Sequence, residues 1–400
     1  MIAKELLMQF KNNLKFTAGI DRQYSKEFAV KGAKIGNSVT IRKPPRFTVN
    51  SGPGINIENV VEESTTLTLS SQKHVDFQFT SQDMTLTIDE FSKRYLAGAG
   101  LALANQVDLD GLTMAAQSAF NTVGVSGTAP AGAGATGAIL TYLQAGQKLD
   151  ELAAPMDGQR SLFINPAAQA GAVAALSGLF QSSSEIGEQY KKGRMGEALG
   201  NEWYMAQNIY SYTTGAQGGT PVVSGAGQTG SSLNTSGWSN SVSNLLQVGD
   251  VFTIAGVYKV NPITKQSTGV LQQFVVQAAA SSNGSGLSTL SISPSIITSG
   301  PTQTVTASPA NSAAISMAVT ASTLTANNIL CHKHAFTLGT ADLQLPRGVD
   351  MAEMATDEES GITMRIVRAF DINNDIFPCR VDILYGWAPM RPEWSCRVLG

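Results

Sequence analysis

The fold is decided by the stretch Gly249-Asp250-Val251-Phe252-Thr253-Ile254-Ala255-Gly256-Val257, which places a β-strand inside an almost uncharged part of the chain. Phe252 and Ile254 alternate on one face, and Gly256 interrupts the alternation as a β-bulge would. The surrounding low-charge block, residues 211–330, has only three charged side chains, Asp250, Lys259 and Lys265, although the whole chain has 27 basic and 30 acidic residues. A composition change of this size marks a separate structural unit. Because charged sequence of mixed α and β pattern lies on both sides, we predict a domain inserted into a host fold.

The low-charge block contains several further strand patterns. Apolar side chains alternate at Val270, Phe274 and Val276, at Leu290 and Ile292, and at Ile315, Met317 and Val319. Gly, Pro and Ser turns separate these short segments. Such a series indicates a small all-β barrel or sandwich, here assigned to residues 211–330.

The sequence before the block predicts an arm and a long hairpin. Residues 1–35 contain one short amphipathic helix followed by a polar stretch with little to bury, which is typical of a terminal arm. Residues 36–80 show period-two alternation around the turn residues Ser51-Gly52-Pro53-Gly54, so we predict a β-hairpin with its tip at 51–57. Two strands alone are marginally stable. The hairpin should therefore lie against its own domain or a neighbouring copy.

Residues 81–210 and 331–400 predict the α+β host. Leu96, Leu103, Val107 and Met114 share one helical face, which predicts a helix of about 30 residues starting near Asp89. Helices over 139–152 and after Pro166 follow, with short strands over 160–165 and 203–209. After the low-charge block, residues 362–370 and 376–387 are expected to form antiparallel strands joined by the turn 371–375.

Composition excludes several classes of protein. The formal net charge of -3 disfavours a general nucleic-acid binder. The three cysteines are too few and too scattered for a disulfide framework, and they indicate a reducing compartment. No run approaches the roughly 18 apolar residues of a membrane span, and the N-terminal segment lacks the apolar core of a signal peptide. We therefore expect a soluble protein with no membrane partner.

Three patterns resemble ligand sites but lack required residues. The glycines at 132, 134 and 137 match a dinucleotide fingerprint without a strand before it. Cys331, His332 and His334 lack the spacing of a zinc site, and the turn 371–375 lacks the Gly and Glu of a calcium loop. With three histidines and no nucleophile elbow, we expect no enzyme activity, no cofactor and no metal.

The order of arm, hairpin, long helix, α+β body, inserted β-domain and closing strands resembles the major capsid proteins of tailed bacteriophages, whose fold is shared with herpesviruses. The likeness rests on 249–257 and on Cys379-Arg380-Val381-Asp382-Ile383-Leu384-Tyr385-Gly386-Trp387 followed by Arg391-Pro392-Glu393. It is strongest to the coat proteins of short-tailed, Salmonella-infecting phages, which carry an inserted β-barrel. In family terms, residues 1–35 are the N-arm and 36–80 the E-loop. Residues 81–210 supply the spine helix, P domain and first part of the A domain, and 331–400 complete the A and P domains.

This resemblance implies a structural function. Copies would form the hexamers and pentamers of an icosahedral virion shell around double-stranded DNA, assembled in the bacterial cytoplasm with a scaffolding protein and a portal. An encapsulin-like compartment with the same fold is an alternative. An extracellular adhesin or tail-fibre module is a third possibility, which the charged α+β flanks and the long helix disfavour.

Charged side chains supply the candidate contacts between subunits. Arg42, Lys43 and Arg46 lie on the ascending arm of the predicted hairpin, and Glu58, Glu62 and Glu63 lie on the descending arm. Opposite patches of this kind set register between subunits more than affinity, although exposed pairs within one arm contribute only about 0–1 kcal/mol each. In the low-charge block the candidates are Asp250, Lys259 and Lys265. Some relatives crosslink a hairpin lysine to a neighbour; residues 51–57 contain no lysine, so no crosslink is expected.

Overall fold

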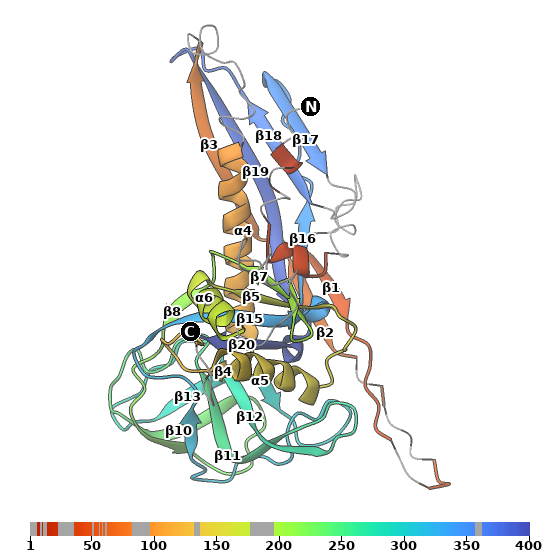
Figure 1. The fold of residues 1–400 in the computed structure, drawn as a ribbon, viewed down its shortest axis with the longest axis vertical. Coiled ribbons are helices and arrows are strands. Elements are labelled where there is room, and N and C mark those ends of the chain that lie inside the picture. The colour runs from red at the N-terminus through yellow and green to blue at the C-terminus, as the bar shows by residue number, and fades with distance from the viewer. Residues whose placement is uncertain are drawn as a thin grey trace. The chain divides into compact units, whose positions relative to one another are not determined.

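The computed structural model describes residues 6–8, 10, 14–22, 36–49, 52–55, 57, 59–60, 62–81, 97–131, 137–176, 196–356 and 362–400. The chain forms two compact units, each assembled from segments far apart in sequence (Figure 1). Unit 1 contains residues 1–41, 64–111 and 336–390, and unit 2 contains 42–63, 112–335 and 391–400. Helix α4 (Ala97–Ser118) contributes residues to both units. The start of the predicted long helix lies outside the described residues.

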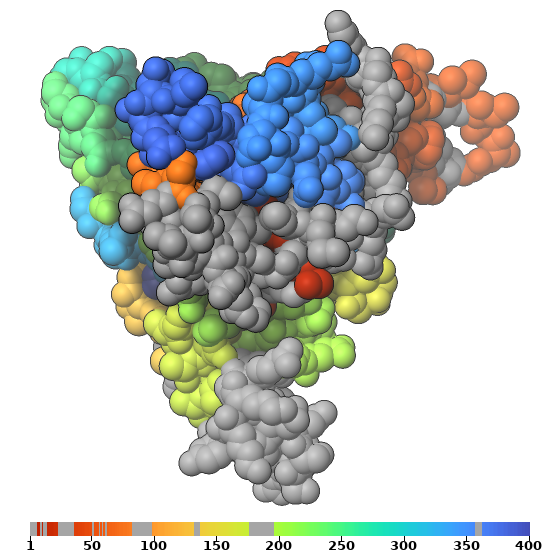
Figure 2. Space-filling model, turned by 90° about the horizontal axis from the view of Figure 1, so that it is seen from above, coloured from red at the N-terminus to blue at the C-terminus, as the bar shows by residue number. Residues whose placement is uncertain are grey.

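The sheet of unit 1 is antiparallel and is organised around the 14-residue strand β19 (Ile376–Pro389). Strand β3 (Ser71–Thr80) pairs with β19 on one side; β18 (Thr363–Arg368) and β16 (Phe336–Ala341) pair with it on the other, and β17 (Met351–Thr356) continues from β18. The predicted strands over 362–370 and 376–387 are confirmed. In the space-filling view, these C-terminal segments, in light and dark blue, lie against one another (Figure 2).

The core of unit 1 includes residues of the N-terminal segment, among them those of the predicted short amphipathic helix. Leu6, Phe10 and Phe16 are fully buried, and Leu6 and Phe10 pack with Leu103 and Val107 of α4. The Asp108 carboxylate accepts hydrogen bonds from the backbone N–H groups of residues 15, 16 and 17 at 2.6–3.2 Å, and from Thr17 Oγ1 at 2.8 Å. The described part of the N-terminal segment therefore packs into this unit. Phe16, at the start of the stretch predicted to bury little, is buried, and residues 23–35 of that stretch lie outside the described residues.

The predicted hairpin also differs from the observed pairing. Strands β1 (Ser38–Arg42) and β2 (Ser64–Thr68) form a two-stranded sheet, as expected for the stem. Strand β3, however, continues past this stem and joins β19 over ten residue pairs, so it belongs to the sheet of unit 1. The stem has a small core of its own, formed by Ile41, Leu67, Ala388 and Met390.

Unit 2 has a seven-stranded mixed sheet. Its order is β4 (Asn121–Gly124), β20 (Ser395–Leu399), β15 (Leu324–His332), β5 (Arg160–Ile164), β7 (Asn201–Met205) and β6 (Glu197–Ala198), and β8 (Ser211–Thr213) also pairs with β15. Helices α5 (Ala138–Glu151) and α6 (Pro166–Leu176) pack on this sheet through Tyr142, Leu149 and Ala168. Within the described residues, no helix combines the length and hydropathy that a bilayer crossing requires.

The low-charge block forms the predicted barrel, also within unit 2. Its antiparallel order is β14 (Ile315–Met317), β11 (Val251–Val260), β12 (Ser267–Val276), β13 (Ser288–Ile296), β10 (Gly230–Trp238) and β9 (Gly219–Val223). A bridge between Val222 and Ala314 links the two ends of this order. Phe252, Ile254 and Phe274 fill the interior, and the β11–β12 register shifts around Gly256 (φ 80°), as a bulge requires. The barrel strands run from residue 219 to residue 317, a shorter range than the predicted 211–330. The two ends of the predicted block form β8 and most of β15, which belong to the host sheet.

Candidate functional site

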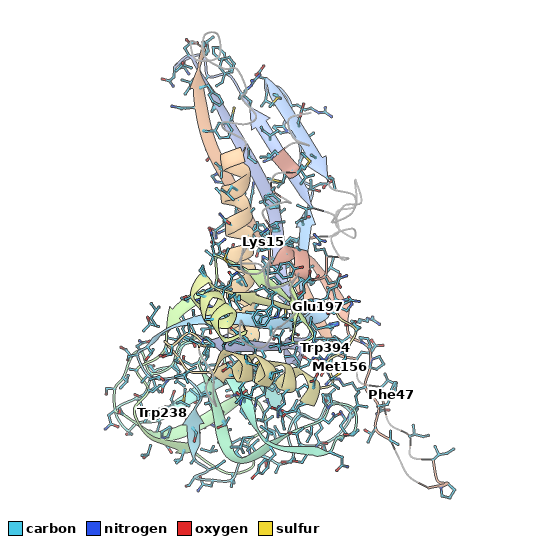
Figure 3. All side chains as sticks on the ribbon, in the orientation of Figure 1. Lys15, Phe47, Met156, Glu197, Trp238 and Trp394 are labelled. Atoms are coloured by element: carbon cyan, nitrogen blue, oxygen red, sulfur yellow. The ribbon has the colours of Figure 1, made fainter. Side chains whose placement is uncertain are left out.

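The loop that joins β1 to β2, residues 43–63, exposes an unusual amount of apolar surface; we call it the hairpin loop. Its exposed apolar side chains are Phe47 (61%), Val49 (89%), Ile55 (92%), Ile57 (88%) and Val60 (58%). Figure 3 shows Phe47 on this segment. Scattered single apolar residues are normal on a protein surface, but a group of this kind marks an interaction site. The hairpin loop is therefore the strongest candidate for contact with another molecule.

Charged residues occupy the base of the hairpin loop. Arg42 and Glu62 form an ion pair at 3.1 Å, with 76% and 53% of their side chains exposed. Arg46 pairs with Glu393 at 2.8 Å in a more buried setting, and the Lys43 N–H donates to the Glu63 carbonyl at 2.7 Å. Of the opposite charges on the two arms, Arg42 and Glu62 therefore already pair within one chain. Glu58 lies outside the described residues.

Asp250, by contrast, is fully buried. Its carboxylate accepts hydrogen bonds from Tyr212 Oη (3.0 Å) and from the backbone N–H groups of Gly215 (3.0 Å) and Gln247 (2.9 Å). Burial raises the pKa of Asp250, while these donors and the neighbouring Arg397 favour the charged form. The expectation that Asp250 contacts another subunit is corrected, because its charge is used inside the chain to join the start of the barrel to the host sheet.

Lys259 is also inside, with 2% of its side chain exposed. Its ammonium group forms an ion pair with Glu151 at the end of α5. Burial lowers the pKa of Lys259, against the favourable effect of Glu151. The prediction that Lys259 contacts another subunit is therefore also corrected, because its side chain makes an internal contact that links the barrel to a host helix.

Lys265 lies in the turn between β11 and β12 and remains half-buried. Its backbone is left-handed (φ 58°), its N–H donates to the Asn261 carbonyl at 2.9 Å, and its Nζ donates to the Pro301 carbonyl. Beside it, Ile263 is 66% exposed. The turn keeps a surface position, so Lys265 stays a candidate contact.

Arg397 is not among the predicted site residues, and it is fully buried near Asp250. Arg397 Nη1 donates to Asn327 Oδ1 at 3.3 Å. A single arginine among the apolar residues Cys396, Val398 and Leu399 was the available sign that a buried strand carries a charge. Asp250, whose charged form Arg397 favours, is 147 positions away in sequence, a distance that no local pattern spans.

Two of the three patterns that resemble ligand sites have structural roles, and the third, with glycines at 132 and 134, lies outside the described residues. His332 Nδ1 accepts the His334 N–H at 3.3 Å, which leaves the proton on Nε2 to donate to Asp157 at 3.1 Å. The Asp371 carboxylate accepts bonds from Asn373 N–H and Asn374 Nδ2 at 2.9 and 2.8 Å, an Asx turn. Among the described residues no group of three or more His, Cys, Asp or Glu side chains could hold a metal ion.

Comparison with known proteins gives a full-length match. The model of the family described as P22 coat protein, gene protein 5, matches residues 1–399. No curated protein matches the sequence. Similar solved structures include Mycobacterium phage Che8 (13% identity, 96% of this chain and 90% of that chain, TM-score 0.47) and the capsid of Ralstonia phage GP4 (8% identity, 96% and 87%, TM-score 0.47). From the family match, the chain belongs to the P22 coat protein family and is a bacteriophage capsid protein that forms the shell of the virion.

Proposed function

We propose that copies of this chain assemble as hexamers and pentamers into an icosahedral head that encloses double-stranded DNA. The observation that carries this proposal is the exposed apolar surface of the hairpin loop, from Phe47 to Val60. Burial of one such side chain contributes about 1.5–3 kcal/mol. A loop that exposes several of them is suited to lie on a neighbouring subunit in the shell.

The charges at the base of the hairpin loop would set the register of that contact. Arg42 and Glu62 are mostly exposed, so their pair within one chain is weak, about 0–1 kcal/mol, and can be exchanged for partners on a neighbour. Lys43, Glu63, Lys265 and the sequence-predicted Glu58 complete the proposed contact set. Arg46 is more deeply placed and already pairs with Glu393, so we assign it to holding the loop base.

The proposed partners follow from the same role. A scaffolding protein would guide assembly, and a portal would occupy one vertex of the head. The net charge of -3 supports enclosure of DNA without sequence-specific binding. We propose a purely structural role, with no catalytic step and no cofactor.

The double variant Ile55→Ser/Ile57→Ser tests this function. Both side chains are about nine-tenths exposed, so the variant should fold normally and yet fail to form closed shells in electron micrographs. The matched control is Ile372→Ser, which removes an 81%-exposed isoleucine from the turn 371–375, outside the proposed contact set, and should leave assembly intact. Closed shells of normal size from the double variant would contradict the proposed role of the loop. Native particles filled with protein cargo and free of DNA would favour a cellular compartment.

A further inference from the structure

Strand β4 lies at the end of the seven-stranded sheet of unit 2, with β20 as its one strand neighbour in the described residues. An edge strand presents unpaired N–H and C=O groups and can pair with another chain. If the chain assembles as proposed above, many free copies are present together before assembly, and such pairing would compete with it. The structure of the β4 edge is therefore informative.

The edge of β4 is closed by a side chain of the inserted barrel. Gln273 of β12 accepts the Thr122 N–H through Oε1 at 2.9 Å and donates through Nε2 to the Thr122 carbonyl at 3.0 Å. Its amide thus takes the place that a peptide group of an adjoining strand would occupy. Thr122 is 4% exposed, so both of its backbone groups depend on this partner.

Contacts around Gln273 hold the barrel against this edge. Gln277 Nε2, from the residue just after β12, donates to the Gln117 carbonyl at 3.2 Å. The buried ion pair of Lys259 with Glu151 ties the end of β11 to α5. An apolar cluster seals the junction; its residues are Phe120, Leu152, Val251, Val275 and Ala318.

We infer that the inserted barrel acts as an edge cap, in which Gln273 satisfies the exposed side of β4 and prevents it from pairing with another copy of this chain. The barrel residues involved face the host sheet of their own subunit. The role therefore concerns the subunit before assembly and does not depend on shell geometry. It also explains why a nearly uncharged barrel carries a polar side chain at this position of β12.

The variant Gln273→Leu tests the cap in the full-length chain, because leucine keeps most of the volume and removes both hydrogen bonds. The matched control is Gln228→Leu. Gln228 also makes several hydrogen bonds to backbone groups, but all of them lie within the barrel, between residues 224 and 234. We expect the Thr122 amide of Gln273→Leu to exchange with solvent about 10-fold faster or more, as loss of a backbone hydrogen bond implies. We also expect sedimentation to show irregular aggregates at the expense of free subunits, whereas Gln228→Leu should retain wild-type behaviour on both measures.

Two outcomes would overturn the inference. One is a Gln273→Leu subunit whose Thr122 amide exchanges as slowly as in the wild type. The other is a subunit whose Thr122 amide is deprotected but which stays as free of aggregates as the control. If Gln273→Leu does not fold, Gln273→Asn replaces it: the amide remains but is one methylene too short to reach both Thr122 groups. This variant should show an intermediate exchange rate and intermediate aggregation, and wild-type values for both would again refute the cap.

Discussion

The buried pair of Lys259 and Glu151 makes an asymmetric prediction. Lys259 is 2% exposed and Glu151 is 16% exposed, so the two partners differ in access to water. Removal of one partner from a buried ion pair costs about 3–5 kcal/mol when the remaining charge is stranded. We expect Glu151→Ala to reach this range, because it strands an ammonium group inside the barrel. The loss of stability cannot exceed about 5 kcal/mol, because at that cost the buried lysine would release its proton at pH 7 and become neutral.

Lys259→Met should be milder. Oε2 of the glutamate left behind is buried, but Oε1 still accepts a hydrogen bond from Gln147 Nε2 at 2.8 Å, so we expect a loss of about 1–3 kcal/mol. In the double variant Glu151→Ala/Lys259→Met no charge is stranded. Its stability should therefore return to within about 1 kcal/mol of the single Lys259→Met variant.

Urea unfolding of the free subunit, followed by tryptophan fluorescence, measures all three variants. The pH dependence gives an internal check: a buried lysine binds its proton less well in the folded chain, so stability rises with pH between the folded and unfolded pKa values. The deficit of Glu151→Ala relative to Lys259→Met should accordingly shrink as the pH rises, by at most about 1.4 kcal/mol per pH unit. Equal losses in the two single variants, or additive losses in the double variant, would refute this reasoning.

Three further predictions concern other parts of the chain. Burial lowers the pKa of His332, so the unfolded chain takes up the proton first as the pH falls. Stability should therefore decrease as the pH drops below about 6.5. His332→Gln keeps a donor for Asp157 and should reduce this loss in thermal unfolding measured at several pH values. In Gly111→Ala the new Cβ would lie 2.6 Å from Trp387 Cζ2. Overpacking of this kind costs about 1–3 kcal/mol, whereas alanine in place of glycine stabilises a helix by roughly 1 kcal/mol. We therefore expect urea unfolding to show a net loss of stability. Gly146→Ala, with open space around it, should instead stabilise the chain. Because the hairpin tip, residues 51–57, contains no lysine, mature particles should run as a single monomer band on denaturing gels, and a covalent ladder would contradict the predicted absence of a crosslink.

Strand patterns with local causes could be predicted well. The alternation of Phe252 and Ile254, the bulge at Gly256 and the pairing around the turn 371–375 all depend on neighbouring residues, and the structure confirms them. The same holds for the helix over Ala138–Glu151 and the one that Pro166 opens.

Features that depend on distant partners could not be predicted. The burial of Leu6 and Phe10 requires α4, and the docking of residues 15–17 requires Asp108, more than 90 positions away. For Asp250 and Lys259, sequence alone does not distinguish a surface charge from a buried one with a partner. Because the block has so few charged residues, Asp250 and Lys259 were predicted to be exposed contacts. In the structure both are buried and have partners inside the chain.

The two ends of the inserted barrel leave the host sheet side by side, because β8 pairs with the start of β15 at Thr213 and Leu324. Sequence can enter and leave at such a point without disturbing the strands around it. This position is therefore a natural site of domain exchange, where a barrel could be replaced by a short turn or by a foreign module. Such an exchange would succeed only if the replacement supplied new partners for Thr122 and Glu151. Without them, the edge of β4 at Thr122 would be open and the Glu151 carboxylate would be unpaired.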